Sequence, residues 1–280
     1  MKKNFGPGLM LVLGLIPGFA YADEVTPSTV TSNVGFISDY TFRGISQNFR
    51  STALQGGFDY ANSSGVYAGT WASNISGNQY SNASMEWDVY GGYNDKLSDN
   101  LGYGFGINYA MYPNGKTAPT QANTNKWDTA EVNAGITFYG LNLKYTYALT
   151  DWYGISSASR GGFEPMMIVD DVATTASAAD NANASLGSQG SNYIEANYTY
   201  SFWGNHSLLL HAGRQTITNF SALSYTDYKV GLTKPFAGFT LGLAFTTTNA
   251  TDNSLYHVIA NGDNKNLRGN IWALSISRSM

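Results

Sequence analysis

The chain has 280 residues, no cysteine, three histidines and a net charge of −4, with only 12% of its side chains charged. The lack of cysteine excludes a disulfide framework and thiolate chemistry, and the acidic balance argues against nucleic acid as a partner. His206, His211 and His257 have no close metal-ligand spacing, so the sequence predicts no metal site and no cofactor.

The first 22 residues have the features of a cleaved secretory signal peptide. Two lysines open the chain, an apolar stretch follows from Leu9 to Phe19, and Ala20-Tyr21-Ala22 matches an A-x-A cleavage site. The stretch is too short to span a bilayer, and an uncleaved anchor is the alternative. Export through the periplasm would leave residues 23–280, with 13 Lys and Arg against 19 Asp and Glu, a net charge of −6.

Apolar side chains recur at every second position in segments of about ten residues. The clearest segment is Leu101–Met111, where bulky residues alternate with Gly, Asn and Ala. A strand between lipid and a water-filled lumen has this pattern. The predicted strands are Asn33–Ile45, Ala53–Ala61, Val66–Asn74, Ser84–Tyr93, Leu101–Tyr112, Thr129–Phe138, Leu141–Thr150, Asn192–Phe202, Ser207–Thr216, Ser224–Lys234, Phe239–Thr247 and Gly269–Met280. The sequence therefore predicts an all-β fold, a closed antiparallel transmembrane β-barrel of about 12 strands that forms one outer-membrane domain over residues 23–280.

The predicted connections alternate in length. Every second one is a short turn, and the others include three long polar segments, 113–128, 151–191 and 249–268. Short periplasmic turns and long external loops are typical of outer-membrane barrels. The low-complexity segment 151–191 is predicted to be a long external loop, either folded into the mouth as a constriction or without a specific role.

Aromatic residues are placed where the predicted strands end. Trp127 and Trp152 fall at outer ends, and Tyr139, Trp203 and Phe236 fall at periplasmic turns. Aromatic girdles at both water–lipid boundaries would account for this placement. The alternative is the general preference of aromatic residues for strands.

Three local segments carry a family resemblance. They are Ser38-Asp-Tyr-Thr-Phe-Arg-Gly-Ile-Ser-Gln47, Ala53-Leu-Gln-Gly-Gly-Phe-Asp-Tyr60 and Gly65-Val-Tyr-Ala-Gly-Thr-Trp-Ala-Ser-Asn74. The region Val34–Asn74 resembles the TorF-like family of proteobacterial outer-membrane porins. The resemblance implies an outer-membrane barrel of porin type and no particular substrate. The chain departs from the usual barrel ending, because it closes on Met280 rather than on an aromatic residue, with Arg278 on the lipid-facing parity.

Strand parity divides the side chains between lipid and lumen. In the first predicted strand it directs Val34, Phe36, Tyr40 and Phe42 to lipid. The predicted pore-lining residues are Asp39, Arg43, Asp59, Glu86, Asp88, Glu131, Lys144, Glu195, Asp227 and Lys229. Seven acids against three bases favour cations over anions, whereas pairing of acids with bases would leave almost no selectivity.

Three finer predictions follow from the same parity. A hairpin about Asn48-Phe49 would place Asp39 and Asp59 opposite each other. Arg214 breaks the parity of its strand, which indicates a β-bulge or a strand end. Glycines on several inward positions leave space for a conduit, or permit barrel bending.

The predicted function is passive diffusion of ions and small solutes through a narrow, weakly cation-preferring channel. The predicted partners are outer-membrane lipid, the diffusing solutes or ions, and the barrel-assembly machinery. One alternative is a non-conducting surface barrel that serves as an adhesin, receptor or structural protein. The other is a barrel-embedded hydrolase, which is disfavoured because His211 is predicted to point inward and no serine elbow is present, so the protein is predicted not to be an enzyme.

Overall fold

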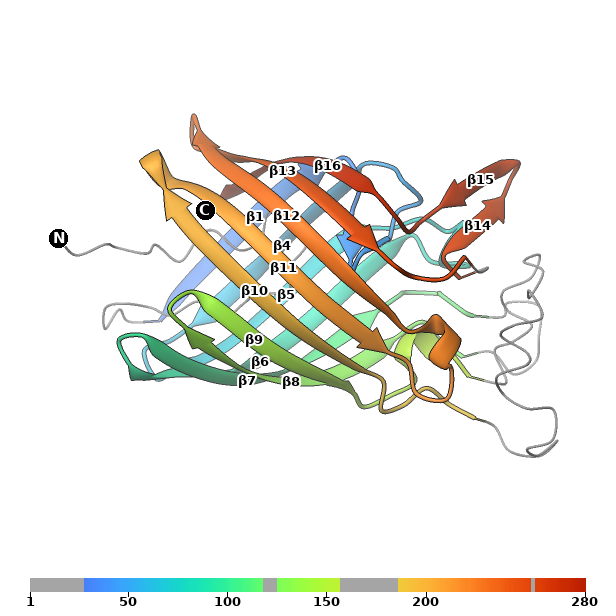
Figure 1. Cartoon of the computed structure of the whole chain (residues 1–280), viewed down its shortest axis with the longest axis horizontal. Coiled ribbons are helices and arrows are strands. Elements are labelled where there is room, and N and C mark those ends of the chain that lie inside the picture. The colour runs from blue at the N-terminus through green and yellow to red at the C-terminus, as the bar shows by residue number, and fades with distance from the viewer. Residues whose placement is uncertain (1–27, 118–124, 157–185, 253–254) are drawn as a thin grey trace.

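Twelve strands close into a single antiparallel barrel (Figure 1). The structure, a computed structural model, describes residues 28–117, 125–156, 186–252 and 255–280. The barrel strands are β1 (Thr29–Ile37), β4 (Ala53–Ala61), β5 (Val66–Asn74), β6 (Met85–Ser98), β7 (Leu101–Met111), β8 (Thr129–Phe138), β9 (Leu141–Ala148), β10 (Asn192–Phe202), β11 (His206–Thr216), β12 (Tyr225–Phe236), β13 (Phe239–Thr248) and β16 (Ile271–Ser279). This architecture confirms the predicted fold class. The predicted signal peptide lies outside the described residues.

The ring is built by pairing strands that are neighbours in sequence. It closes where β1 pairs with β16. Two small antiparallel pairs stand apart from the ring: β2 (Thr41–Phe42) with β3 (Ile45–Ser46), and β14 (His257–Ala260) with β15 (Asp263–Asn266). The described residues also form the short 3-10 helices η2 (Trp152–Gly154), η4 (Trp203–Asn205) and η5 (Ser221–Leu223). No helix in the described ranges is long and apolar enough to cross a membrane.

The two ends of the barrel differ, as predicted. At one end, which we call the short-turn end, the barrel strands are joined by residues 62–65, 99–100, 139–140, 203–205 and 237–238. At the other, the long-loop end, they are joined by residues 38–52, 75–84, 112–128, 149–191, 217–224 and 249–270. β1 begins and β16 ends at the short-turn end (Figure 1). Most of the predicted loop 151–191 lies outside the described residues.

The outward face of the ring is an apolar band. Its exposed side chains include Phe36, Phe58, Val89, Phe105, Ile136, Tyr145, Ile194, Leu232, Leu243 and Trp272. A continuous exposed apolar surface of this kind is costly in water and is what a barrel presents to lipid. At the short-turn end, Tyr139, Trp203 and Phe236 are also exposed, as the girdle prediction requires.

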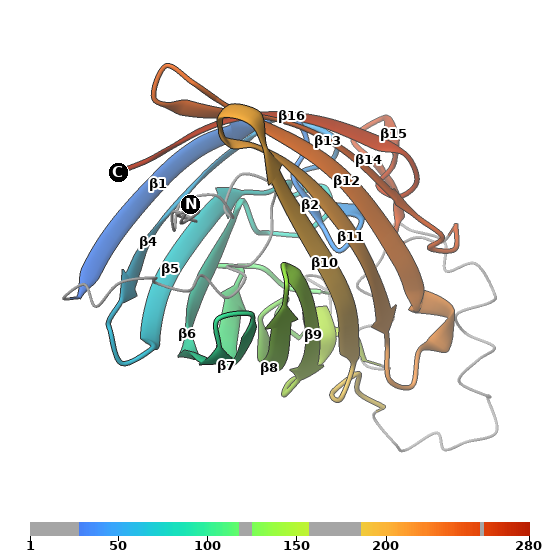
Figure 2. The ribbon, with the colours of Figure 1, turned by 60° about the vertical axis from the view of Figure 1, so that its left-hand side comes forward.

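The first predicted strand, Asn33–Ile45, is wrong in its second half. β1 ends at Ile37, which pairs with Ala53 of β4, and the chain then turns inward. Residues 38–52, which we call the plug, enter the lumen, where Figure 2 shows β2 inside the ring. The alternation of Tyr40 and Phe42 misled the parity argument, because these rings pack against other rings inside the barrel and not against lipid.

The register of β1 with β4 overturns two further expectations. Asp59 pairs with Thr31 near the short-turn end, so Asp39 in the plug is not opposite it. The hairpin turn at the centre of this connection is Arg43-Gly44, and residues 48–51 form only a second turn that leads into β4. Arg214 is an outward residue near the end of β11, in unbroken register with Ile194 and Thr226, and so marks a strand end and not a bulge.

A hydrophobic core fills the lumen at the long-loop end. It contains plug residues such as Tyr40 and Phe49 and rings from the other long loops. Tyr80 stacks on Tyr112 with 5.0 Å between ring centroids and meets Trp127 edge-on at 5.3 Å. Trp127 and Trp152 are therefore buried in this core, and their predicted place in an outer girdle is wrong.

Candidate functional site: the lumen and its plug

All ten residues predicted to line the pore lie inside the barrel. Asp39 and Arg43 belong to the plug, and the other eight occupy inward positions of the barrel strands. Six of these eight are buried, and Asp59 and Lys144 are half-buried. The structure divides them among three places: the tip and base of the plug, the wall of β8–β12, and the wall of β4–β7.

The tip of the plug is a two-residue turn. Arg43 and Gly44 connect β2 to β3 with φ of 45° and 82°, the pair of positive values that a type I′ hairpin requires. A Cβ on Gly44 would lie 2.6 Å from the Cβ of Asp227 on β12. Glycine therefore permits both the turn and the close approach of the tip to the barrel wall.

Arg43 fastens the tip across the lumen. Its two terminal nitrogens donate to both carboxylate oxygens of Glu131 on β8 at 2.9 and 2.8 Å, and Nη1 also donates to Gln215 on β11 at 2.8 Å. The guanidinium lies 4.4 Å from the ring centroid of Tyr193 on β10. Burial opposes the charge, but the Glu131 carboxylate more than offsets it and raises the pKa of Arg43 above its ordinary value.

The base of the plug is held by a second set of polar contacts. Ser46 donates to Asp39 at 2.6 Å, and Arg50 lies 3.6 Å from the other Asp39 oxygen. Burial nevertheless raises the pKa of Asp39 to about 6 against these two influences. Arg50 also donates to the carbonyls of Asn266 and Arg268, each at 2.7 Å, which ties the plug to the last long loop.

The inward charges of β8–β12, which we call the paired wall, contact one another. Lys144 lies 2.7 Å from Glu195, and His211 lies 3.0 Å from Asp227. Asn197 donates to Glu195 at 2.8 Å, which leaves its carbonyl oxygen to accept from Nδ1 of His211 at 2.7 Å. The inward charged residues on this wall are Glu131, Lys144, Glu195, His211, Asp227 and Lys229.

His211 is placed between acceptors on both sides. Its Nδ1 faces the Asn197 carbonyl, and its Nε2 faces an Asp227 oxygen at 3.0 Å. Tyr193 donates to the other Asp227 oxygen at 2.8 Å. The His211 ring therefore joins Asn197 of β10 to Asp227 of β12 within the paired wall. Lys144 binds Glu195 on the neighbouring strand and does not reach across the lumen.

The inward charges of β4–β7, which we call the acid wall, are all carboxylates: Asp59, Glu86 and Asp88. Tyr90 donates to Asp59 at 2.6 Å, and Tyr112 donates to Glu86 at 2.9 Å. Among the ion pairs of the described residues, none includes any of these three acids.

Several inward glycines are covered by neighbouring rings. A Cβ at Gly69 would lie 2.5 Å from the Tyr90 ring, one at Gly106 would lie 2.5 Å from the Tyr67 hydroxyl, and one at Gly213 would lie 1.8 Å from the Tyr193 hydroxyl. These glycines therefore accommodate tyrosines from adjacent strands and do not by themselves leave open space. Sequence reasoning missed the tyrosines and Gln215, because parity shows which residues point inward but not which of them meet.

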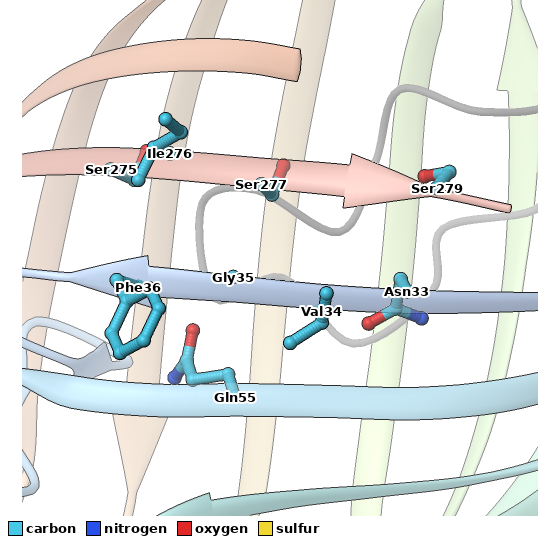
Figure 3. Close-up of a pocket in the computed structure, with 9 residues that line it drawn as sticks. All are labelled: Asn33, Val34, Gly35, Phe36, Gln55, Ser275, Ile276, Ser277 and Ser279. Carbon is cyan, nitrogen blue, oxygen red and sulfur yellow. The ribbon is translucent and has the colours of Figure 1, made fainter. Parts of the chain in front are cut away.

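The surface also carries a small dent at the closing seam. Figure 3 shows Gly35 of β1 beside Ser277 of β16, with Val34 and Gln55 nearby. Its volume is about 10 Å³, roughly enough for one water molecule. The dent is therefore too small for a solute site.

The fold and the lumen together define a class: a β-barrel with an apolar outer face and a strand connection inserted into its interior. The chain belongs to the Gcw_chp family, described as "Bacterial protein of unknown function", whose sequence profile matches residues 21–280. No curated protein matches the chain. The family description does not include the TorF-like label, which stays a prediction.

Solved structures with a similar arrangement include three proteins with porin or outer-membrane names. The KdgM porin in complex with disordered oligogalacturonate has 7% identity and a TM-score of 0.47, with 90% of this chain and 99% of that one covered. The NanC porin has 10% identity, a TM-score of 0.48, and coverage of 89% and 98%. The outer membrane protein opdK from Pseudomonas aeruginosa has 14% identity, a TM-score of 0.38, and coverage of 82% and 58%. The fold assignment of this chain rests on its own strand pairing.

Proposed function

We propose that this protein is an outer-membrane channel for passive diffusion of ions and small solutes, and that the plug closes it in the conformation described. The observation that carries the proposal is the plug's place in the chain. It is a connection between β1 and β4, which pair over nine residue pairs without it. Its withdrawal would therefore leave the ring of twelve strands intact.

The outer membrane is the bilayer that fits this barrel. The exposed apolar band needs lipid, and the division into short turns and long loops is that of outer-membrane barrels. The long-loop end then faces the exterior and the short-turn end the periplasm. Outer-membrane lipid and the barrel-assembly machinery are the partners that such a location implies.

A weak preference for cations is part of the proposal. On the paired wall, acids and bases contact each other, so their fields largely cancel. On the acid wall, Asp59, Glu86 and Asp88 have no basic partner among the described ion pairs. A lumen with an excess of carboxylates attracts cations, and salt weakens the effect.

Planar-bilayer recording of the refolded protein tests the proposal. We would replace residues 39–49 with a short Gly-Ser linker and compare this variant with the unaltered chain. The unaltered protein is expected to conduct rarely, and the variant to conduct continuously with a reversal potential that favours cations in a salt gradient. A folded variant that carries no current would overturn the proposal.

A non-conducting surface barrel is the second candidate. The hydrophobic core at the long-loop end favours it, because rings from several loops interlock there with the plug. The same recording separates the two candidates. If the barrel stays closed after the plug is replaced, the other loops are sufficient to seal it, and a role at the cell surface is the better account.

A further inference from the structure

The plug is flanked by two of the long loops. Around the ring, β1 and β4 stand between β16 and β5, so the connection at 38–52 lies between the loop at 249–270 and the loop at 75–84. The first of these two loops carries the β14–β15 hairpin, which stands beyond the ring at the long-loop end (Figure 1). The base of the plug is therefore placed between the hairpin loop and the loop at 75–84.

Both loops bind the base of the plug at the same residue, Ser46. Its backbone N–H donates to the carbonyl of Leu267, directly after β15, at 2.8 Å, and its own carbonyl accepts from Nε2 of Gln79 at 2.8 Å. Tyr80, beside Gln79, donates to the Gln47 side chain. Ser46 is fully buried, so water does not compete for these bonds while the plug is in place. A plug that leaves the lumen must therefore break with one loop or carry that loop with it.

The hairpin also packs on the plug. Arg50 donates to the carbonyl of Asn266 in β15 at 2.7 Å. Val258 of β14 and Leu267 are buried in the same hydrophobic core as Phe49 of the plug. Separation of the hairpin from the plug would expose this apolar surface to water, which is unfavourable. The hairpin and the plug therefore form one packed unit.

The two flanking loops are joined to each other at the tip of the hairpin. Asn261 and Gly262 form its two-residue turn, with φ of 54° and 85°. Nδ2 of Asn261 donates to Oδ1 of Asn78 in the other loop at 2.8 Å. Together with the two bonds at Ser46, this contact completes a closed set that runs from the plug to the hairpin, to the loop at 75–84 and back to the plug.

We propose that the β14–β15 hairpin is a strap that retains the plug, and that its tip must separate from Asn78 before the plug leaves the lumen. While the tip is attached, the two loops stay together on either side of Ser46. Once the tip separates, the hairpin is free to move away with the plug. This inference rests on the proposed function in one respect only, that departure of the plug opens a channel.

Cross-linking the tip tests the strap. The chain has no cysteine, so two introduced thiols react without competition. We would join Asn78→Cys to Asn261→Cys with a short thiol-to-thiol reagent and follow hydrogen exchange of the detergent-solubilised full chain by mass spectrometry. Cross-linking should slow amide exchange across residues 38–52 at least about fivefold relative to the same protein before the reaction, because exchange of a protected segment follows its local opening. Exchange in β7, which belongs to the ring, should not change.

Thr247→Cys with Asn270→Cys is the matched control pair. These two side chains also form a 2.8 Å hydrogen bond at the long-loop end, but it joins the hairpin loop to β13 and not to the loop at 75–84. Cross-linking this pair should leave exchange of the plug unchanged. If cross-linking Asn78→Cys to Asn261→Cys slows exchange of the hairpin and not of the plug, the proposal is overturned.

Asn78→Ala tests the same contact without cysteine. It removes the acceptor of Asn261, so the plug and the hairpin should both exchange about twofold faster or more, whereas Asn270→Ala should alter neither. An unchanged rate across residues 38–52 in Asn78→Ala would contradict the strap. Hydrogen exchange does not depend on conductance, so a barrel that carries no current would overturn the proposed channel and leave this test in force. In a barrel that does conduct, cross-linking the tip should lower the open fraction, and an open fraction that stays the same would overturn the strap alone.

Discussion

The two charged walls of the lumen differ in whether their buried carboxylates have a basic partner. On the paired wall, Glu195 has Lys144 at 2.7 Å and Asp227 has His211 at 3.0 Å. On the acid wall, Glu86 and Asp88 are buried to a similar degree without a basic partner in the described ion pairs. The degree of burial therefore does not determine whether a charged side chain in the lumen has a partner of opposite charge. The difference lies in whether a cross-strand neighbour supplies the opposite sign.

The plug contacts the two walls in different ways. Arg43 is a base carried into the lumen by a connection and not by a strand, and it binds the paired wall at Glu131. The other side of the plug faces the acid wall, where Tyr40 packs on Trp71 at 5.4 Å between ring centroids. The plug is thus joined to one wall by charge and to the other by aromatic contact.

The sharpest test neutralises one residue on each wall. Lys144→Met would leave Glu195 buried with less opposite charge, and we expect a loss of about 3–5 kcal/mol in the free energy of unfolding. Asp88→Asn removes a buried charge that has no basic partner in the described ion pairs, and it should leave that free energy unchanged or raise it. Urea unfolding in detergent, followed by tryptophan fluorescence, measures both. Equal losses would mean that the walls do not differ.

The second test separates the plug from the paired wall. Arg43→Met removes three hydrogen bonds of a charged donor. Such bonds contribute about 1.5–3 kcal/mol each, so the ratio of open to closed channel should rise at least about tenfold. Single-channel recording measures the open fraction. Arg43→Lys is the matched control, because it keeps the charge and should raise the open fraction less. An unchanged open fraction in Arg43→Met would show that the contacts of Arg43 do not keep the plug in the lumen.

The ring could be predicted from the sequence because alternation and turn lengths are local. The strand predicted at Leu101–Tyr112 is β7, which spans Leu101–Met111. The same argument failed at residues 38–45, where Tyr40 and Phe42 alternate in the same way. Alternation records that every second side chain is apolar. It does not distinguish lipid from a hydrophobic core inside the barrel.

Burial of the charged set could also be predicted, but its pairing could not. Parity places Lys144 and Glu195 inside, whereas the contact between them depends on the register of β9 with β10. The Arg43 contacts join residues 88 and 172 positions apart in the chain. No local sequence pattern predicts contacts between residues so far apart in the chain, because such contacts form only when the whole ring closes. The turn signal was present, however, since Arg43-Gly44 includes the glycine that a type I′ hairpin favours.

Asp39 is an intermediate case between the two walls. It has a base, Arg50, at 3.6 Å, yet burial still raises the pKa of Asp39 from 3.8 to about 6. Because the folded-state pKa is the higher one, the folded plug binds the proton more tightly. Its contribution to stability is complete below about pH 4 and is lost as the pH rises through about 6. We expect a decrease of at most about 3 kcal/mol.

Thermal unfolding between pH 4 and 7 measures this effect. In Asp39→Asn the dependence attributable to this residue should disappear, while the rest of the profile is retained. A profile that keeps its full slope in the variant would assign the titration to another group.

The smallest effect is expected at a pair that resembles the paired wall in chemistry but not in burial. Asp252 lies 3.0 Å from Arg268 and 2.8 Å from His257, and more than half of its side chain is exposed. Hydrogen bonds from these two residues lower the pKa of Asp252, so its contribution is present at neutral pH and is lost only under acidic conditions. Exposed pairs contribute about 0–1 kcal/mol, and Asp252→Asn should therefore change the free energy of urea unfolding by less than about 1 kcal/mol. A loss as large as that of Lys144→Met would show that a pair of opposite charges stabilises the fold as strongly when it is exposed as when it is buried. Desolvation would then not explain the contrast between the two walls.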